Sequence, residues 1–251
     1  MDIAFVGEQD KFLVVYLDDI TVFSKNDGEH IEHLRRTFEK CRRCGLSLNP
    51  QKSLFALDEG KLLGHIVTKD GVKIDPKRVE VINIIPLPRN KKEVQVFLGR
   101  INFLRRFIPN YAEIVRHITD MLKKENEVKW SQESRDAFIR IKRAFAEAPV
   151  LAGPDYSKPF MVFSFASPHT IAGVLLHKNE EGYEQPITFF SQVLYDAELK
   201  YNILEKQASS LVKSLKAFRV YILQSHITAY VPTAAVKDIL VQGDSEGRRG
   251  R

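Results

Sequence analysis

Residues 12–24 read Phe-Leu-Val-Val-Tyr-Leu-Asp-Asp-Ile-Thr-Val-Phe-Ser, and this stretch decides the fold of the first part of the chain. Two runs of β-forming residues, 12–17 and 20–23, flank the adjacent aspartates Asp18 and Asp19. Runs rich in Val, Ile, Tyr and Phe are typical of strands. The pattern predicts a buried hairpin that carries two carboxylates at its tip.

Two chemical interpretations of the Asp18-Asp19 pair follow from the residues alone. Aspartate favours turns because its side chain forms hydrogen bonds with nearby backbone. Two carboxylates directed towards one site would repel each other unless a cation lay between them. Mg²⁺ is typically held by one or two carboxylates together with substrate phosphates. The pair therefore indicates either an ordinary turn or part of a magnesium site.

The segments around this pair resemble a known family. Tyr16-Leu17-Asp18-Asp19, with its apolar flanks, resembles the central palm motif of reverse transcriptases. The segments that follow resemble, in family order, the pol polyprotein of Ty3/gypsy-type retrotransposons. They are His30-Ile31-Glu32-His33-Leu34, Gly45-Leu46-Ser47-Leu48-Asn49-Pro50-Gln51-Lys52, Leu63-Gly64-His65, Phe97-Leu98-Gly99 and Trp130-Ser131. The resemblance extends from about residue 5 to residue 240.

The resemblance implies a reaction and roles for individual residues. The reaction is RNA-directed DNA synthesis on an RNA or DNA template–primer, catalysed by two metal ions. Asp18 and Asp19 are the implied palm carboxylates that bind Mg²⁺. Lys52 is either the general acid for the leaving pyrophosphate or an ordinary surface lysine. The implied primer grip comprises Leu63, Gly64 and His65, where the glycine allows either close approach of a sugar-phosphate chain or local packing.

The resemblance also implies that parts of a complete polymerase are not in this sequence. The fingers and the first palm aspartate precede the hairpin in the family, so the full magnesium ligand set is not expected here. Integrase, protease and a second nuclease are also missing. We therefore expect a polyprotein fragment that does not polymerise alone. The alternative is a non-catalytic nucleic-acid-binding or structural remnant of a transposon polyprotein.

Composition indicates a protein with real apolar cores and a basic segment. The chain has 251 residues, of which 44% are hydrophobic, and a net charge of +6. Residues 69–125 contain 13 Lys+Arg against 7 Asp+Glu, so this segment alone carries 13 − 7 = +6. Such an excess suits a polyanionic partner. There is no signal peptide and no long apolar run, so we expect an intracellular protein, within a cytoplasmic virus-like particle if the resemblance holds.

Residues 26–45 are predicted to form a helix with Asp27 as its N-cap and Gly45 at its end. We expect its apolar stripe to pack beneath the palm sheet; the stripe consists of Ile31, Leu34, Phe38 and Cys41. His30 and His33 share a face but lack a third ligand, so they are interpreted as surface polar residues. Cys41 and Cys44 lack a second pair, so we assign them no zinc site.

Residues 69–126 resemble the thumb of the family. A helical apolar stripe runs from Val94 to Ile108, where Pro109 ends it, and Arg105 falls on this stripe. The cations elsewhere on the segment are candidates for phosphate contact, or else form a solvated basic face. They are Lys91, Lys92, Arg100 and Arg106.

Residues 127–154 are predicted to be a linker and connecting helix, with Ser131 as N-cap and Trp130 as a docking residue for the next unit. Residues 155–240 resemble a ribonuclease H-like domain with a mixed sheet. The predicted strands cover 160–164, 172–177, 186–191 and 227–231, with a long helix before the last one. Residues 241–251 are predicted to be disordered.

The nuclease motif departs from the family pattern. The first metal-binding aspartate belongs in Thr-Asp-Ala-Ser, but this sequence reads Ser164-Phe165-Ala166-Ser167. The helix glutamate remains as Glu205, whereas the next aspartate aligns with Pro232. Because Phe and Pro cannot hold Mg²⁺, we expect an inactive nuclease domain that serves as a scaffold, with Phe165 filling the former metal cavity. This pattern resembles the plant Tat lineage of retrotransposons.

The predicted fold class is therefore α+β. A partial palm of β-hairpin sheet and helix covers 1–68, and a helical thumb covers 69–126. A ribonuclease H-like α/β domain follows the connecting helix.

Overall fold

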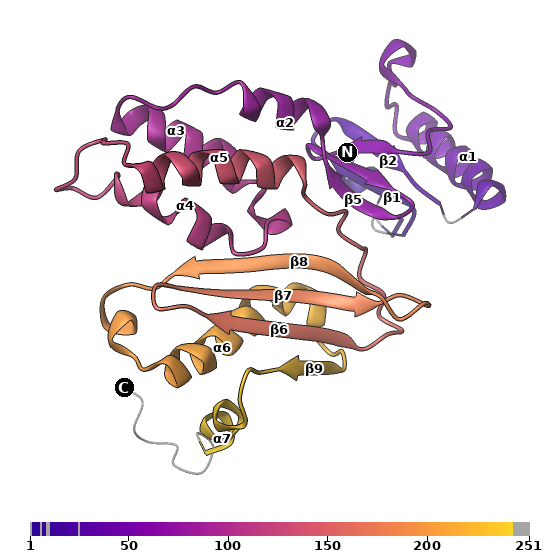
Figure 1. The fold of residues 1–251 in the computed structure, drawn as a ribbon. Helices are drawn as coiled ribbons and strands as arrows, with labels where there is room; N and C mark the ends of the chain where they lie inside the picture. The colour runs from indigo at the N-terminus through magenta and orange to yellow at the C-terminus, as the bar shows by residue number, and fades with distance from the viewer. Residues whose placement is uncertain (1, 6, 9–10, 25, 243–251) are drawn as a thin grey trace. The chain divides into compact units, whose positions relative to one another are not determined.

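Two compact units make up the chain, and the computed structural model describes residues 2–5, 7–8, 11–24 and 26–242 (Figure 1). Contacts between residues divide the chain into Met1–Leu62 and Leu63–Arg251. The mixture of helices and sheets confirms the predicted fold class. Within the described ranges, no helix has both the length and the apolar character needed to cross a membrane.

The first unit contains the predicted hairpin. Strands β1 (Leu13–Tyr16) and β2 (Asp19–Val22) pair antiparallel, and a two-residue turn joins them. A small core lies on one side of the hairpin, and Phe5, Phe12 and Leu13 are buried in it. The remaining elements of this unit are η1 (Asp2–Phe5), α1 (Asp27–Arg43), η2 (Pro50–Lys52) and β3 (Gly60–Leu62).

Helix α1 differs from the prediction in its cap. Asn26, rather than Asp27, is the N-cap, because the Asn26 side chain accepts a hydrogen bond from the Glu29 backbone N–H at 2.9 Å. Gly45 has a φ of +65°, so a glycine follows the helix as predicted.

The predicted apolar stripe of α1 is buried only at its C-terminal end. Cys41 is 3% exposed, whereas Ile31 is 65% exposed and Phe38 is 37% exposed. Thr37, which is not on the stripe, is buried, and the ring of His33 stacks on Phe12 at 4.2 Å. The inward face therefore follows His33, Thr37 and Cys41, and the expected burial of Ile31 and Phe38 was wrong.

Four helices of the second unit enclose one apolar core, which we call the helical core. They are α2 (Pro76–Asn83), α3 (Lys91–Asn102), α4 (Tyr111–Asp120) and α5 (Gln132–Ala146). The predicted stripe from Val94 to Ile108 lies in this core. However, α3 ends at Asn102, and the stripe continues through the short 3-10 helix η3 (Arg105–Phe107).

The connecting helix α5 belongs to the helical core, with Ser131 as the predicted N-cap. The Trp130 ring packs edge-on against Phe138, and its indole N–H donates to the Pro88 carbonyl at 2.6 Å. The expectation that Trp130 docks the next unit was therefore wrong. The residue instead fixes the start of α5 against the loop before α3.

A β-hairpin precedes the helical core and is fastened to it. Strands β4 (His65–Thr68) and β5 (Gly71–Ile74) pair antiparallel. Val72 and Leu151 exchange two backbone hydrogen bonds, of 2.7 and 2.8 Å, which tie β5 to the segment after α5. Gly71 permits this approach, because a Cβ on it would lie 2.1 Å from the Leu151 carbonyl oxygen.

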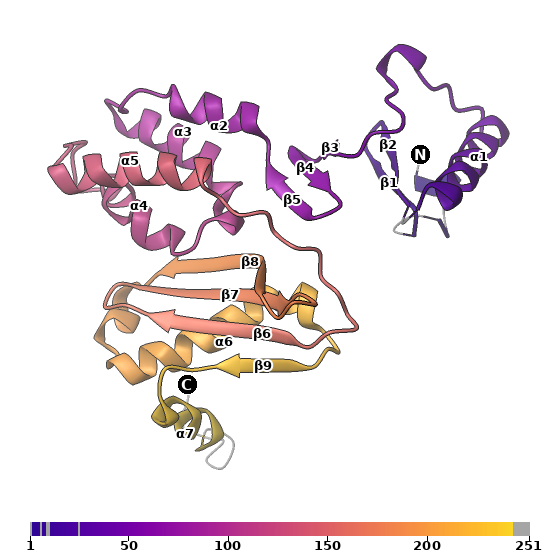
Figure 2. The same ribbon diagram turned by 45° about the vertical axis from the view of Figure 1, so that its right-hand side comes forward.

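The last part of the second unit is a four-stranded sheet in the order β8-β7-β6-β9. Its strands are β6 (Phe160–Ala166), β7 (Thr170–Lys178), β8 (Glu184–Val193) and β9 (Ile227–Tyr230). Strand β9 runs parallel to β6, and the other pairs are antiparallel, so the sheet is mixed as predicted. Helix α6 (Ile203–Ile222) lies along one face of the sheet (Figures 1 and 2).

Helix α7 (Ala234–Gln242) was not predicted. It includes residues 241–242, so the expectation that these two residues are disordered was wrong, and residues 243–251 of the predicted tail lie outside the described residues.

Buried and part-buried hydrogen bonds join the helical core to the sheet. The Ala112 backbone N–H donates to the Ser191 hydroxyl at 2.9 Å, and the Arg105 guanidinium donates to the Ser191 carbonyl at 2.8 Å. Glu113 accepts from the Thr170 hydroxyl at 2.6 Å. Burial opposes ionisation of Glu113, but hydrogen bonds from Thr170 and Ser167 outweigh burial and lower its pKa. Polar contacts thus fix α4 on β7 and β8.

Replacing Ser191 tests this junction. Ser191→Ala leaves the buried Ala112 N–H without an acceptor, and an orphaned buried group costs about 1–3 kcal/mol. We expect that loss in the free energy of unfolding measured by urea denaturation. Ser209→Ala, at a half-buried position on α6, is the matched control and should cost little. Equal unfolding midpoints for both variants would contradict the assigned role of Ser191.

Candidate nucleic-acid interface

The Asp18-Asp19 pair lies at the exposed tip of the hairpin. Asp18 follows Leu17 in the turn, and Asp19 opens β2 opposite Tyr16. Both carboxylates are exposed, so the expectation of a buried tip was wrong. Leu17 is 78% exposed and has a φ of +54°, a region that L-residues seldom adopt. The turn therefore presents both carboxylates to solvent on a strained backbone.

The two aspartates form an incomplete set of metal ligands. Each offers the carboxylate oxygens that Mg²⁺ prefers. In the part of the chain that the structure describes, no group of three or more His, Cys, Asp or Glu side chains is placed to hold an ion. The pair fits a site that is completed by substrate phosphates or by ligands from elsewhere.

Other candidate residues of the first unit have local roles or remain exposed. Lys52 is exposed at the end of the short helix η2. His30 and His33 are half-buried, and their Nδ1 atoms lie 3.1 and 2.7 Å from the Ser24 hydroxyl. The two histidines thus hold the strand exit against α1. Cys41 is buried and Cys44 is exposed, and both are free thiols.

An aromatic cluster surrounds His65 in the second unit. The His65 ring stacks on Phe103 at 4.7 Å with an interplanar angle of 5°, and it contacts Phe107 at 5.2 Å. Arg78 lies over Phe103 at 4.8 Å, and Arg106 lies over Phe107 at 5.8 Å. Burial is the main reason that the pKa of His65 falls below its ordinary 6.5, and the two nearby guanidinium charges lower it further.

The three residues of the predicted primer grip do not share one environment. Leu63 is 49% exposed, with a φ of +50°, and Gly64 has a φ of +77°. These two residues form the turn before β4, whereas the His65 side chain packs inward. Sequence reasoning did not identify Arg78, because the spacing between residues 64, 78 and 103 carries no periodic signal.

The predicted phosphate-binding cations divide into two groups. Lys91 donates to the carbonyls of Lys123 and Lys124, at 2.7 and 3.2 Å, so it stabilises the loop after α4. Lys92 and Arg100 are exposed on α3. Arg106 is half-buried, and its Nε has no hydrogen-bond partner. Lys92 and Arg100 are therefore the predicted cations most open to a ligand.

The residues at the predicted nuclease position do not offer a set of metal ligands. Phe165 is 56% exposed, so the expectation that its ring fills a cavity was wrong. Pro232 is exposed after β9. The Glu205 carboxylate accepts from the Asn202 backbone N–H at 2.9 Å in a capping box that begins α6. Glu205 therefore has a structural role, and we derive no metal-dependent step at this position.

The backbone near Phe165 is also held by structural hydrogen bonds. Ser210 donates to the Phe165 carbonyl at 2.9 Å, and the buried Lys206 ammonium donates to the Pro168 carbonyl at 2.9 Å. These bonds fasten α6 to the end of β6 and to the following loop.

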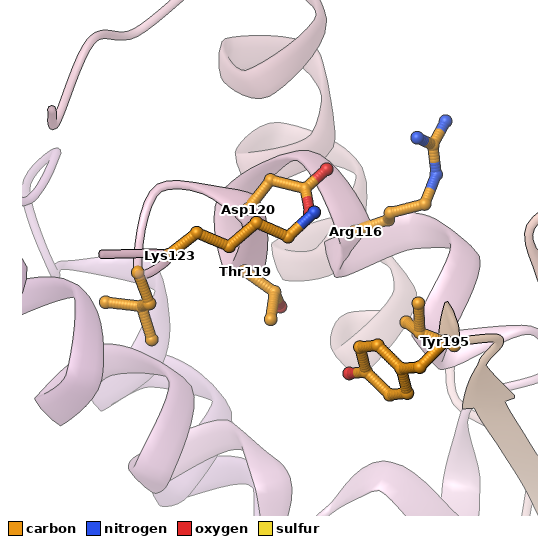
Figure 3. A pocket seen from close by; sticks show the side chains of 7 residues that line it. Arg116, Thr119, Asp120, Lys123 and Tyr195 are labelled. Carbon is orange, nitrogen blue, oxygen red and sulfur yellow. The ribbon is translucent and has the colours of Figure 1, made fainter. Parts of the chain in front are cut away.

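One pocket of about 240 Å³ lies beside α4 and the end of β8 (Figure 3). Its lining includes Arg116, Thr119, Lys123 and Tyr195. The Lys123 ammonium pairs with Asp120 at 2.7 Å, which neutralises part of the local charge. None of the predicted site residues lines this pocket.

Two family models match the chain. Residues 3–67 match the family "Reverse transcriptase (RNA-dependent DNA polymerase)". Residues 130–229 match "RNase H-like domain found in reverse transcriptase". The chain carries reverse transcriptase and ribonuclease H-like domains of a transposon polyprotein.

Similar proteins extend these matches. The Retrovirus-related Pol polyprotein from transposon 297 of Drosophila melanogaster is 38% identical over 85% of this chain and 20% of its own length. The Transposon Tf2-3 polyprotein of Schizosaccharomyces pombe is 29% identical over 86% of the chain and 16% of its own length. The Tf2 relatives support the Ty3/gypsy assignment. The chain thus spans about a fifth of the length of the curated relatives it matches.

Solved structures of a viral reverse transcriptase have a similar fold. The foamy viral protease-reverse transcriptase in complex with dsDNA has a TM-score of 0.80 and 29% identity, over 96% of this chain and 50% of that chain. The same enzyme in complex with RNA/DNA hybrid has a TM-score of 0.78, over 95% of this chain and 32% of that chain. Both domain families generally use divalent metals.

The lowered pKa of His65 leads to a prediction for the reverse transcriptase segment. Because the folded state disfavours the protonated ring, stability is complete above the unfolded pKa near 6.5 and falls as pH drops towards the folded pKa. His65→Phe keeps an aromatic ring in the stack but removes the titration. We expect the wild-type chain to lose more unfolding free energy than the variant between about pH 7.5 and pH 5, measured by urea denaturation. Identical pH profiles would contradict the prediction.

Proposed function

We propose that this chain binds the primer–template of RNA-directed DNA synthesis and forms part of a retrotransposon reverse transcriptase. The similarity to the foamy viral enzyme in complex with dsDNA carries the proposal, because it covers 96% of the chain at a TM-score of 0.80. The excess positive charge of residues 69–125 supports the same partner, since phosphate contacts dominate nucleic-acid affinity.

In this proposal, the exposed hairpin tip belongs to the polymerase centre. Asp18 and Asp19 would supply carboxylate oxygens to Mg²⁺, which would activate the primer 3′-hydroxyl and stabilise the departing pyrophosphate. Lys52, exposed on its short helix, would neutralise or protonate the leaving group. The cytoplasmic virus-like particle typical of such elements is the proposed location.

The ribonuclease H-like domain has a structural role in this proposal. Its sheet supports the helical core through Ser191 and Thr170, and its predicted nuclease position offers one carboxylate that already caps a helix. The chain then positions nucleic acid without cutting it.

Binding is tested with a labelled primer–template duplex. Lys92→Gln with Arg100→Gln removes two exposed charges from α3. Each lost phosphate contact should reduce the slope of log affinity against log salt by about 0.9. We expect weaker binding and a shallower slope, measured by fluorescence anisotropy at several salt concentrations. Unchanged affinity and slope would argue against this face, and no binding by the wild-type chain would overturn the proposed function.

Catalysis by the 251-residue chain is tested separately. Because the described residues hold no complete metal site, we expect neither primer extension nor cleavage of an RNA/DNA hybrid in Mg²⁺ or Mn²⁺. Primer extension that Asp18→Asn abolishes would overturn the first expectation. Hybrid cleavage that Glu205→Gln abolishes would overturn the second. Binding without turnover would also agree with the alternative, a non-catalytic remnant of the polyprotein.

A further inference from the structure

Three segments of the second unit converge on one cationic-aromatic cluster. His65 comes from β4, Arg78 from α2, and Phe103 and Arg106 from the end of α3 and η3. The Arg78 guanidinium lies 4.8 Å from the centre of the Phe103 ring, whose other contact is the stacked His65 ring at 4.7 Å. Stacking on a ring fixes a guanidinium plane and leaves its N–H edge free to donate.

Gly64 makes room for the Arg78 side chain. A Cβ placed on Gly64 would lie 2.7 Å from the Arg78 Nη2 atom and 3.3 Å from its Cζ atom. The φ of +77° separately disfavours any side chain at this position. The glycine of the Leu63-Gly64-His65 motif therefore has an identifiable partner, and that partner is a guanidinium group.

The cluster holds two guanidinium groups, those of Arg78 and Arg106. The charges that act on the His65 ring are those of the same two arginines. Two buried polar atoms of the cluster, His65 Nδ1 and Arg106 Nε, also lack partners. Two guanidinium groups beside a Phe103 ring that is 47% exposed give this surface a positive charge that suits an anion.

We propose that Arg78, which lies over the Phe103 ring and is accommodated by Gly64, binds a backbone phosphate of the primer–template duplex. A planar guanidinium matches two phosphate oxygens, which a flexible lysine does not. This inference rests on the proposed function and adds a residue that no motif identified. The competing role for Arg78 is purely structural, as a cation packed on an aromatic ring.

The experiment measures binding of a fluorescently labelled primer–template DNA duplex to the full chain at a series of KCl concentrations. Arg78→Gln should weaken binding about tenfold and reduce the salt slope by about 0.9, as expected for the loss of one phosphate contact. Gly64→Ala should weaken binding in the same direction, because the methyl group displaces the guanidinium. Arg219→Gln removes an equal charge from an exposed position on α6 and should change neither quantity.

Folding and charge are controlled separately. Arg78→Lys keeps the charge but loses the planar fork, so we expect reduced affinity with the salt slope largely retained. This variant provides the test if circular dichroism shows that Arg78→Gln does not fold. A lower melting temperature with unchanged affinity and slope would assign Arg78 a structural role and overturn the inference. If Arg78→Gln and Arg219→Gln weakened binding equally, the loss of affinity would reflect the change in net charge rather than a contact made by Arg78. That outcome would also overturn the inference.

Failure of this inference is distinguishable from failure of the proposed function. If the wild-type chain binds the duplex and Arg78→Gln binds equally well, only the role of Arg78 is lost. If the wild-type chain does not bind the duplex, both are lost.

Discussion

The contact between α4 and the mixed sheet is the interaction on which the second unit depends. The first turn of a helix has backbone N–H groups without partners in the helix. Here the Ala112 N–H finds its acceptor in Ser191 on β8, and Glu113 in the same turn accepts from Thr170 on β7. Arg105, a charged residue in an otherwise apolar stripe, reaches the Ser191 carbonyl. Because these groups are at least partly desolvated, each gains from its partner, and the helical core and the sheet form one compact unit.

Under the proposed function, this dependence gives the ribonuclease H-like sheet a structural role that does not need a nuclease site. Thr170 and Ser191, which support the helical core, lie on β7 and β8, and Ser167, directly after β6, also donates to Glu113. The predicted nuclease position lies at the end of β6 and the start of α6. Glu205 remains useful there because a capping box satisfies backbone N–H groups at the start of α6. The proposed replacement of metal ligands by Phe165 and Pro232 would therefore leave the contacts of Ser191 and Thr170 intact.

The reverse transcriptase segment contains one exposed candidate site, the Asp18-Asp19 turn, and one compact cluster, around His65. Asp18 and Asp19 are exposed, and the turn that carries them includes Leu17 at positive φ. The His65 cluster is more compact, because two phenylalanine rings desolvate the imidazole and two guanidinium groups oppose its protonation. Both places retain features that folding alone does not require, and such features are typical of sites that meet a ligand.

The sequence by itself determined the elements whose signals are local. Apolar patterns with periods of 2 and 3.6 residues predicted the hairpin, the helical stripes and the strands of the mixed sheet. They could do so because each pattern depends only on residues close together in the sequence. Ordered motifs also identified the domain families. Tertiary structure alone decided which neighbour each side chain meets. Helix α1 turned Thr37 inward. The Trp130 indole donated to the Pro88 carbonyl, Lys91 donated to the loop after α4, and Arg78 lay over the Phe103 ring. These outcomes depend on contacts between residues far apart in the chain, and neither spacing nor composition encodes the geometry of such contacts.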